Sequence, residues 1–208
     1  MTLSIVARCS KTGDLGACTT TVNLAVGNRV PYVEPNVGAI CTQAYTNVLY
    51  GINGLKLLKL RFSPQTALEA MRKDDQDRES RQVIIIDRYD RTAAFTGKEC
   101  VERKGHLIGN HHVVAGNKLT AVDVLDEVDE EFRKSKGNLA NRLLRAIEAG
   151  QAADGDKRGG SAALLVAKQS QSEIPSYIQL RVDYHEDPVK ELRRVFEEYR
   201  RIYASTFW

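Results

Sequence analysis

The sequence predicts an α+β fold in which two antiparallel sheets pack together and helices cover their outer faces. Strand-like segments come in adjacent pairs at the start, in the middle and near the end of the chain. Helix-like segments also come in pairs, and they lie between the strand pairs. Folds in which single strands alternate with single helices fit this order less well. No linker-like tract divides the 208 residues, so we expect one domain over residues 1–208.

The first elements are expected to form a hairpin. Residues 3–8 and 15–22 are both rich in β-forming residues, and the intervening Lys11-Thr12-Gly13-Asp14 has turn chemistry. Residues 37–43 predict a third strand, because they follow the turn-forming pair Pro35-Asn36.

Two helices are expected next. Leucines at positions 55, 57, 58 and 60 favour a helix over residues 49–60. Ser63 followed by Pro64 is an N-cap with a first-turn proline, which predicts a second helix reaching about residue 73. The strongly charged stretch 73–81 is expected to be an exposed loop.

A buried hairpin is predicted after that loop. Residues 82–87 contain four consecutive β-branched side chains, which is typical of a central strand covered on both faces. Residues 92–96 are its expected partner. The segment 97–118 is predicted to be a loop.

A second pair of helices follows. Thr120, with Asp123 three positions later, resembles the start of a capping box and predicts a helix from that point. Asn138 is expected to cap another helix, which Gly150 would end.

The last elements are two strands and a helix. A glycine-containing loop over residues 155–160 leads into a strand over 161–167, and residues 177–183 predict the final strand. Asp187 and Pro188 then begin an amphipathic helix.

Composition excludes several classes of partner. The net charge of +3 comes from 30 basic and 27 acidic residues, a balance that argues against nucleic acid. No apolar run approaches the ~20 residues that span a bilayer, and the start lacks the pattern of a signal peptide. The four cysteines form no CxxC pair and match no zinc pattern. We expect reduced thiols and a cytoplasmic protein.

Thr2 has the sharpest chemical interpretation. A small second residue permits removal of Met1, after which the Thr2 hydroxyl and α-amine belong to the same residue. An α-amine has a reference pKa of about 7.7–8, so it can accept the hydroxyl proton near neutral pH. This is the Thr–N-terminal-amine form of an activated nucleophile, and it predicts amide cleavage through an acyl-enzyme.

The chain resembles the DUF1028 family over nearly its whole length. The stretches that carry the resemblance are Ser4-Ile5-Val6-Ala7-Arg8, residues 24–28 and 30–31, Val37-Gly38-Ala39-Ile40-Cys41-Thr42-Gln43, residues 46–47, 50–51, 81–82 and 114–119, Asp156-Lys157-Arg158-Gly159, residues 161–166 and 180–183, His185, Asp187-Pro188 and Leu192. The resemblance implies a branch of the N-terminal-nucleophile (Ntn) hydrolase superfamily and its four-layer αββα sandwich, and it names no substrate. The chain departs from the family pattern at Cys9-Ser10, where Asp-Pro is usual, and at Thr19-Thr20-Thr21, where Ser-Lys is expected.

Acyl transfer also needs groups that stabilise the oxyanion and orient the substrate. Asn117 can supply a side-chain amide, or it is a turn residue tolerant of unusual φ. Thr42 and Gln43 are further candidates, although a buried amide bonded to backbone is the alternative for Gln43.

Three charged residues form a second group of candidates. Asp156, Lys157 and Arg158 can hold a carboxylate or adjust the pKa of the terminal amine, or they belong to a solvated loop. Arg8 shares a strand face with Thr2 by parity, which suits substrate contact and a structural salt bridge equally.

The four histidines, His106, His111, His112 and His185, are not spaced like metal ligands. We therefore expect no metal and no cofactor, with His106 as a pocket candidate. The predicted function is therefore hydrolysis of an amide or related C–N bond in a small or peptide-like substrate.

Two alternatives remain open. One is a hydrolase on the same fold that uses His106 or His112 with a carboxylate. The other is a non-catalytic oligomeric scaffold, because the aromatic end of the chain, Tyr199, Tyr203, Phe207 and Trp208, suits an interface as well as docking of the last helix. A homo-oligomer is expected in either case.

Overall fold

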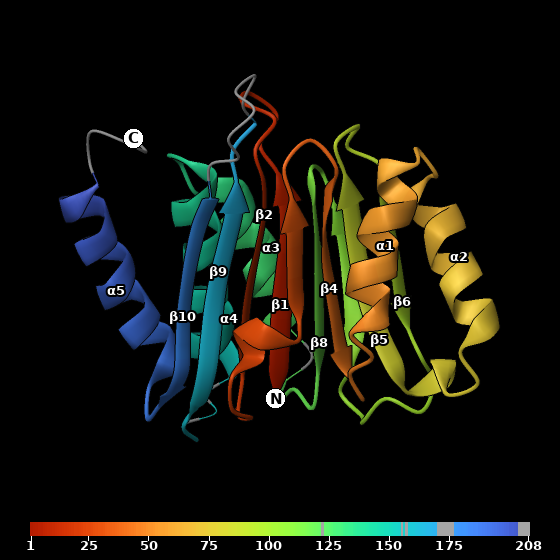
Figure 1. Cartoon of the computed structure of the whole chain (residues 1–208). Coiled ribbons are helices and arrows are strands. Elements are labelled where there is room, and N and C mark those ends of the chain that lie inside the picture. Colours follow the sequence, from red (N-terminus) through yellow and green to blue (C-terminus); the bar gives the residue numbers. More distant parts are fainter. Residues whose placement is uncertain (122, 155, 157, 170–176, 204–208) are drawn as a thin grey trace.

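The protein is a mixed α+β fold built on two antiparallel sheets (Figure 1). A computed structural model describes residues 1–121, 123–154, 156, 158–169 and 177–203. In that part of the chain five α-helices flank the sheets: α1 and α2 pack on one sheet, and α3, α4 and α5 pack on the other.

The larger sheet contains the N-terminal strand at an internal position. Its strand order is β10-β9-β2-β1-β8-β7, and all neighbours are antiparallel. Its strands are β1 (Thr2–Arg8), β2 (Leu15–Thr21), β7 (Gly105–Gly109), β8 (His112–Asn117), β9 (Gly160–Ala167) and β10 (Tyr177–His185). Because β1 pairs on both sides, its first residue is held by hydrogen bonding to two neighbours.

The smaller sheet has the order β3-β4-β5-β6. Its strands are β3 (Pro31–Glu34), β4 (Gly38–Ala44), β5 (Arg81–Asp87) and β6 (Thr92–Thr96). Every residue of β5 is buried, which confirms the central position expected from its run of β-branched side chains.

Helices α2 and α5 begin at the capping residues that the sequence predicts. The α-helices are α1 (Leu49–Lys59), α2 (Pro64–Asp74), α3 (Val124–Lys134), α4 (Leu139–Asp154) and α5 (Pro188–Ile202), and short 3₁₀ helices cover Val26–Asn28 and Arg78–Ser80. Ser63 accepts from the Thr66 amide at the start of α2, and Asp187 accepts from the Lys190 amide at the start of α5. Both caps were recognisable in the sequence.

Strand alternation divides the apolar side chains among three layers of core. Leu3 and Ile5 point toward α3, α4 and α5, whereas Val6 points toward the other sheet. On β5, Ile84 and Ile86 join the core between the sheets, and Val83 and Ile85 join the core under α1 and α2. Polar residues on the faces between the sheets are therefore enclosed from both sides.

The prediction of a loop over 97–118 was wrong. Residues 105–109 and 112–117 form β7 and β8, which pair with each other and, through β8, with β1. β7 is a short edge strand with glycine at both ends, and β8 contains Gly116 and Asn117, so local β propensity is low. The four-residue β3, which begins at Pro31, was also missed.

Three smaller expectations also failed. Thr120 does not begin a helix: its amide donates to Asp154 Oδ1, tying the segment before α3 to the end of α4. Gly150 does not end α4, because it lets the helix approach the sheet closely; a Cβ there would meet Leu3 Cδ2 at 2.5 Å. The stretch 73–81 is not uniformly exposed, since Arg81 is buried against Asp75.

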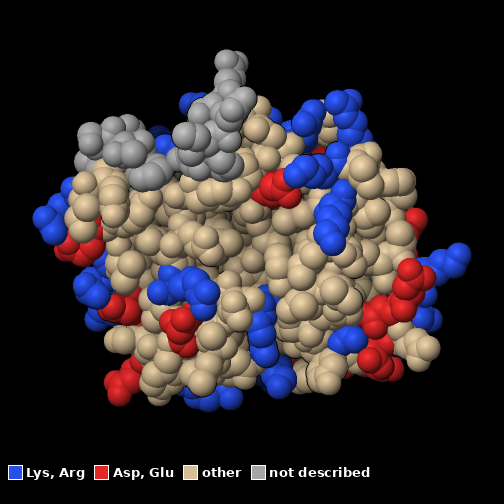
Figure 2. Space-filling model, viewed as in Figure 1, with Lys and Arg blue, Asp and Glu red and all other residues tan. Residues whose placement is uncertain are grey.

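Charge on the surface is mixed. On the face that Figure 2 shows, Lys and Arg lie beside Asp and Glu around the margin, and a broad area without charged residues occupies the middle. Among the described residues, no helix combines the length and apolar composition that crossing a bilayer requires.

Candidate functional site

A cavity lies where β1 begins, at the end of the sheets that carries the N-terminus (Figure 1). Its volume is about 310 Å³. The lining residues come from the ends of several strands and the loops that follow them: Met1, Thr2, Asn23, Ala44, Tyr45, Ser80, Glu99, Cys100, Val101, Asn117 and Lys118. Two of the sequence candidates, Thr2 and Asn117, are among them.

Thr2 is the central residue of this wall. It pairs with Thr21 on one side and with Asn117 on the other, so both neighbouring strands restrict its position. Thr2 is 9% exposed, and its Oγ1 lies 2.9 Å from Thr21 Oγ1. Because Thr21 donates its hydroxyl proton to the Met1 carbonyl, the proton between the two hydroxyls comes from Thr2.

A buried polar network supports Asn117 from behind. Asn117 Nδ2 donates to Gln82 Oε1 at 2.9 Å, and Gln43 Nε2 donates to the same oxygen at 2.7 Å. Ser4 then donates to Gln43 Oε1 and contacts Thr19 Oγ1 at 2.7 Å. These side chains come from both sheets, and a hydrogen-bonded network of this kind specifies one arrangement of the groups it connects.

Met1 occupies space beside the proposed nucleophile. Its side chain is 2% exposed and belongs to the core under α3, α4 and α5. Its carbonyl accepts from the Val22 amide at 3.3 Å, which extends the pairing of β1 with β2. While Met1 is present, the nitrogen of Thr2 is a peptide nitrogen and cannot act as a base.

Asp156 and Arg158 lie near the N-terminal nitrogen of Met1. Asp156 Oδ2 is 3.8 Å from the Met1 nitrogen, and Arg158 Nη2 donates to the same carboxylate at 2.6 Å. Burial lowers the pKa of the terminal amine below its ordinary value; Asp156 opposes this shift, and Arg158 adds to it. The hydrogen bonds from Arg158 hold the pKa of Asp156 at about 2, so the carboxylate is ionised.

Two residues at the rim have left-handed backbones. Ala44, with φ 68°, ends β4, and Lys118, with φ 53°, follows β8. Non-glycine residues in this region cost about 1 kcal/mol or more, and such strain concentrates at functional sites. Lys118 also lowers the pKa of the terminal amine, which places its charge within electrostatic reach of that group.

Thr42 and Gln43 lie on opposite faces of β4. Gln43 faces the space between the sheets, where it belongs to the network and not to the cavity wall. Thr42 points toward the helix side and donates to the Asn47 carbonyl at 3.1 Å. Adjacent strand residues cannot share a face, so only one of the pair can approach the site.

Arg8 is far from Thr2 although the two share a face. Six residues at about 3.3 Å each place it roughly 20 Å away, at the other end of β1. Its amide donates to the His111 carbonyl there. Strand parity identified the face correctly, but it contains no information about distance along the strand.

His106 does not line the cavity around Thr2. His106 Nδ1 lies 2.8 Å from Thr96 Oγ1, and burial lowers the pKa of the histidine. Gln82 Nε2 donates to the same Thr96 oxygen. His106 is therefore connected to Asn117 only indirectly, through the hydrogen bonds of Thr96 and Gln82. Lys157 lies outside the described residues.

Histidines elsewhere have structural partners. His112 is fully buried, with Nε2 2.8 Å from Asp129 Oδ1 and Nδ1 2.9 Å from the Asn110 carbonyl. Both ring nitrogens are therefore engaged. Within the described ranges, no group of three or more His, Cys, Asp or Glu side chains is arranged to hold a metal ion.

The residues missed from the sequence were Thr21, Gln82, Tyr45, Glu99 and Lys118. Thr21 had a signal, because Thr19 and Thr21 alternate on one face of a strand predicted to pair with β1. Gln82 stands beside an apolar run, and the sequence pattern predicts only that it belongs to the same strand. The other three lie in loops or at strand ends, where no periodicity applies.

Together these groups can support acyl transfer. Thr2 provides a hydroxyl at a cavity, Asn117 provides a side-chain amide directly across the register, and charged residues surround the terminal nitrogen. These described side chains do not form a cluster of His, Cys, Asp or Glu that would hold a metal cation.

Comparison with known proteins agrees with the sequence resemblance. Residues 2–192 match a family described as "Family of unknown function (DUF1028)". The crystal structure of protein SPO2555 from Silicibacter pomeroyi, a member of the same family, is 30% identical in sequence and superposes with a TM-score of 0.87. That match covers 96% of this chain and 89% of the other. No curated protein matches the chain.

Proposed function

The chain belongs to the DUF1028 family, and on that premise we propose that it is an Ntn hydrolase that cleaves an amide or related C–N bond through a Thr2 acyl-enzyme. The single observation that carries the proposal is the position of Thr2, buried at the wall of a cavity with Asn117 opposite it in the β1–β8 register. The active form in this proposal lacks Met1.

The layer order supports the proposal. Helices α1 and α2, the four-stranded sheet, the six-stranded sheet and helices α3–α5 follow one another through the three cores. This is the order expected of the αββα sandwich of Ntn hydrolases. In such a sandwich the first residue of a central strand is a well-restrained position for a nucleophile.

In the proposed reaction Thr2 supplies both the nucleophile, its hydroxyl, and the base, its α-amine. The neutral Thr2 amine takes the hydroxyl proton as Thr2 Oγ1 attacks the amide carbonyl carbon, and a C–O bond forms. The tetrahedral intermediate collapses, the C–N bond breaks, and the amine proton moves to the leaving nitrogen. Water then attacks the ester with the same amine as base, releasing a carboxylic acid and restoring Thr2.

Supporting groups are assigned by their positions. Asn117 Nδ2 uses one N–H on Gln82, and its second N–H is the proposed oxyanion donor. Removal of Met1 also removes the carbonyl that accepts from Thr21, so the Thr21 hydroxyl becomes able to donate to Thr2 or to substrate. Asp156 and Arg158 set the pKa of the amine, and no cofactor takes part.

The cavity suits a small or peptide-like amide. Its volume of about 310 Å³ lies at the lower end of the range for small-molecule sites. Glu99 and Lys118 bring one acidic and one basic side chain to the wall, so polar ends of either charge can be accommodated.

The alternatives gain no comparable support. His112 and Asp129 form a hydrogen-bonded pair, but His112 is fully buried and its ring packs on Phe132, with 4.6 Å between ring centroids. A scaffold role and a homo-oligomer remain proposals. At the C-terminal end the Tyr199 and Tyr203 rings contact each other, and residues 204–208 lie outside the described part of the chain. The four free cysteines suit the cytoplasmic location that we propose.

Covalent labelling tests the proposal without knowledge of the substrate. Two versions of the chain, released from a cleavable N-terminal fusion, would begin at Thr2 and at Met1. An electrophilic β-lactone should acylate Thr2 in the first version, with one added mass on the N-terminal peptide. The Met1-initiated version should remain unlabelled.

Two variants of the Thr2-initiated chain complete the design. Thr2→Ala should abolish labelling. Thr20→Val should label normally, because Thr20 is another buried threonine on the same sheet, and its hydroxyl donates to the Ser161 carbonyl and not to the cavity. Equal labelling of the Met1-initiated and Thr2-initiated chains would refute the mechanism.

A further inference from the structure

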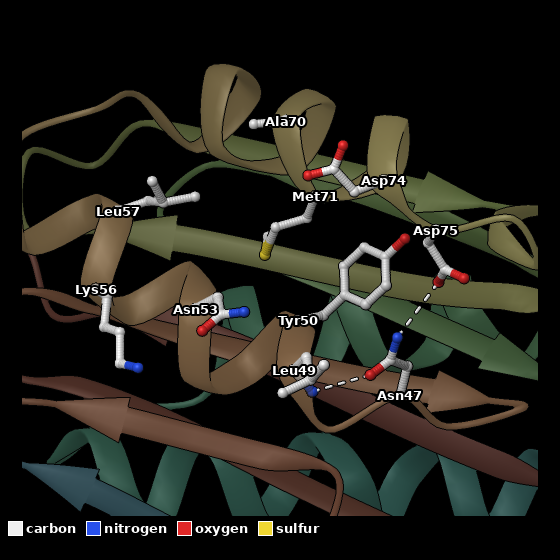
Figure 3. A pocket seen from close by; sticks show the side chains of 10 residues that line it. All are labelled: Asn47, Leu49, Tyr50, Asn53, Lys56, Leu57, Ala70, Met71, Asp74 and Asp75. Atoms are coloured by element: carbon white, nitrogen blue, oxygen red, sulfur yellow. Dashed lines mark hydrogen bonds between the residues drawn. The ribbon is translucent and has the colours of Figure 1, made fainter.

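A second cavity lies between α1 and α2, on the outer face of the four-stranded sheet (Figure 3). Its volume is about 460 Å³, larger than the cavity at Thr2. The lining residues are Asn47, Leu49, Tyr50, Asn53, Lys56, Leu57, Ala70, Met71, Asp74 and Asp75. None of them lines the cavity at Thr2, so the two spaces are separate.

Tyr50 presents an unsatisfied hydroxyl to this cavity. The residue is 1% exposed, and its hydroxyl has no hydrogen-bond partner. Burial raises the pKa of Tyr50 above its usual range, and the Asp75 carboxylate adds to this shift; the hydroxyl lies near that carboxylate but forms no hydrogen bond of ordinary geometry with it. Buried hydroxyls are usually hydrogen-bonded, and Figure 3 shows this one directed between Asp74 and Asp75.

The two aspartates are not equivalent. Asp75 accepts from Arg81 Nε at 2.9 Å and from Asn47 Nδ2 at 3.4 Å, so its charge is already compensated. Asp74 ends α2, is exposed, and forms no ion pair within the described part of the chain. Asp74 therefore contributes a negative charge without a counter-ion to the same cavity that the Tyr50 hydroxyl lines.

The body of the cavity is apolar. Leu49 and Leu57 contribute from α1, and Ala70 and Met71 contribute from α2. In Figure 3 the Met71 thioether points into the space between the helices. A methionine wall adapts to ligands of different shape, because the side chain is unbranched and polarizable.

We infer that this cavity binds a small amphipathic molecule with one primary ammonium group. The ammonium donates to Tyr50 Oη and to the Asp74 carboxylate, and the apolar tail lies along Leu57 and Met71. The Tyr50 hydroxyl turns its proton toward Asp75 and accepts from the ligand, which satisfies both its donor and its acceptor functions. This inference does not depend on the function proposed for Thr2.

Lys56 restricts the far end of the ligand. It lies six residues beyond Tyr50 on α1, about 9 Å along the helix axis. A second ammonium at that distance would meet a like charge, whereas a neutral end or a carboxylate would not. The site therefore distinguishes a monoamine from a diamine of the same length.

Titration with three simple probes tests the inference. Backbone amide shifts of the full chain would be followed by NMR while n-hexylamine, 1-hexanol or 1,6-diaminohexane is added. Hexylamine should shift amides of α1 and α2 in a saturable way. Hexanol and the diamine should each bind on the order of tenfold more weakly, because one lacks the charge and the other meets Lys56.

Variants locate the binding groups. Asp74→Asn and Tyr50→Phe should each weaken hexylamine binding by about tenfold. Tyr50→Phe should fold normally, because Asp75 keeps its hydrogen bonds from Arg81 and Asn47 when the hydroxyl is lost. Asp77→Asn, a neighbouring exposed aspartate outside the cavity, is the matched control and should bind like the parent. Equal binding of hexanol and hexylamine, or equal effects of Asp74→Asn and Asp77→Asn, would overturn the inference.

Discussion

The side-chain amide of Asn117 donates to Gln82 Oε1 over 2.9 Å, and this bond joins the two sheets. Asn117 ends β8 in the six-stranded sheet, and Gln82 lies in β5 of the four-stranded sheet. Gln82 is fully buried, and its amide nitrogen donates to the Gly116 carbonyl at 2.9 Å. The position of Asn117 beside Thr2 therefore depends on how the sheets pack together, as well as on β8 itself.

Gln82→Leu should destabilise the protein by about 2–4 kcal/mol, because it removes the acceptor for Asn117 Nδ2, one of the two acceptors for Gln43 Nε2, and the donor to the Gly105 and Gly116 carbonyls in a buried site. Urea unfolding at pH 7 measures the change in the free energy of unfolding. The exposed Gln65→Leu is the control and should stay within about 0.5 kcal/mol of the parent. Similar values for the two variants would show that the network contributes little.

Asn117→Ala should reduce the rate of Thr2 acylation by about 10²–10³-fold if Asn117 stabilises the oxyanion. The rate is measured by intact mass after β-lactone treatment of the Thr2-initiated chain. Asn110→Ala, in the turn that precedes β8, should acylate within about twofold of the parent. A normal rate in Asn117→Ala, with unchanged unfolding, would remove Asn117 from the proposed mechanism.

Asp156→Asn and Arg158→Gln should move the pH profile of acylation in opposite directions. Asp156 raises the pKa of the terminal amine and Arg158 lowers it, and removal of Met1 displaces the amine by only about 3.8 Å. Loss of the carboxylate should therefore lower the amine pKa and extend activity to lower pH. Loss of the guanidinium should do the reverse. Shifts of the same sign in both variants would contradict this assignment.

Asp75→Asn should lower the free energy of unfolding by about 2–3 kcal/mol at pH 7, because it leaves the buried Arg81 without its main counter-ion. Hydrogen bonds from Arg81 lower the pKa of Asp75 to about 2, whereas an unfolded aspartate has a pKa of about 3.9. The stabilisation is thus complete above about pH 4 and is lost as the pH falls toward 2.

The measurement is urea unfolding of parent and variant at pH 7, 5 and 3, and the difference between them should shrink at pH 3. Asp77→Asn is the control, since Asp77 also contacts Arg81, at 3.3 Å, but its side chain is 70% exposed. It should cost less than about 1 kcal/mol at every pH. A difference between parent and Asp75→Asn that does not change with pH would mean that the ion pair is not its source.

Local signals predicted most elements correctly. Ser63 and Asp187 marked the starts of α2 and α5, and the β-branched run marked β5. The prediction failed over 97–118, where β8 is stabilised by pairing with β1 about 110 residues earlier in the chain, and not by its own composition.

The candidate site was predicted only in part. Thr2 and Asn117 were found from their chemistry, and both line the cavity. Gln43, named as an oxyanion or orientation candidate, lies in the buried network behind the cavity wall, and Thr42 lies on the other face of β4. Gln82 was missed because nothing near it in the sequence indicates that it would meet Asn117 from the opposite sheet.

The amino-acid sequence alone determined the hairpins β1–β2, β5–β6 and β9–β10, the caps of α2 and α5, the family, and a threonine at position 2, because each depends on a few neighbouring residues or on motifs that can be compared directly. Only the tertiary structure decided which strand ends meet at Thr2, that Arg8 lies at the far end of β1, and that Tyr50 keeps an unpartnered hydroxyl between two helices. Those relationships arise from strand register and sheet packing. Both bring together residues that are distant in the chain, so neither produces a periodic pattern in the sequence.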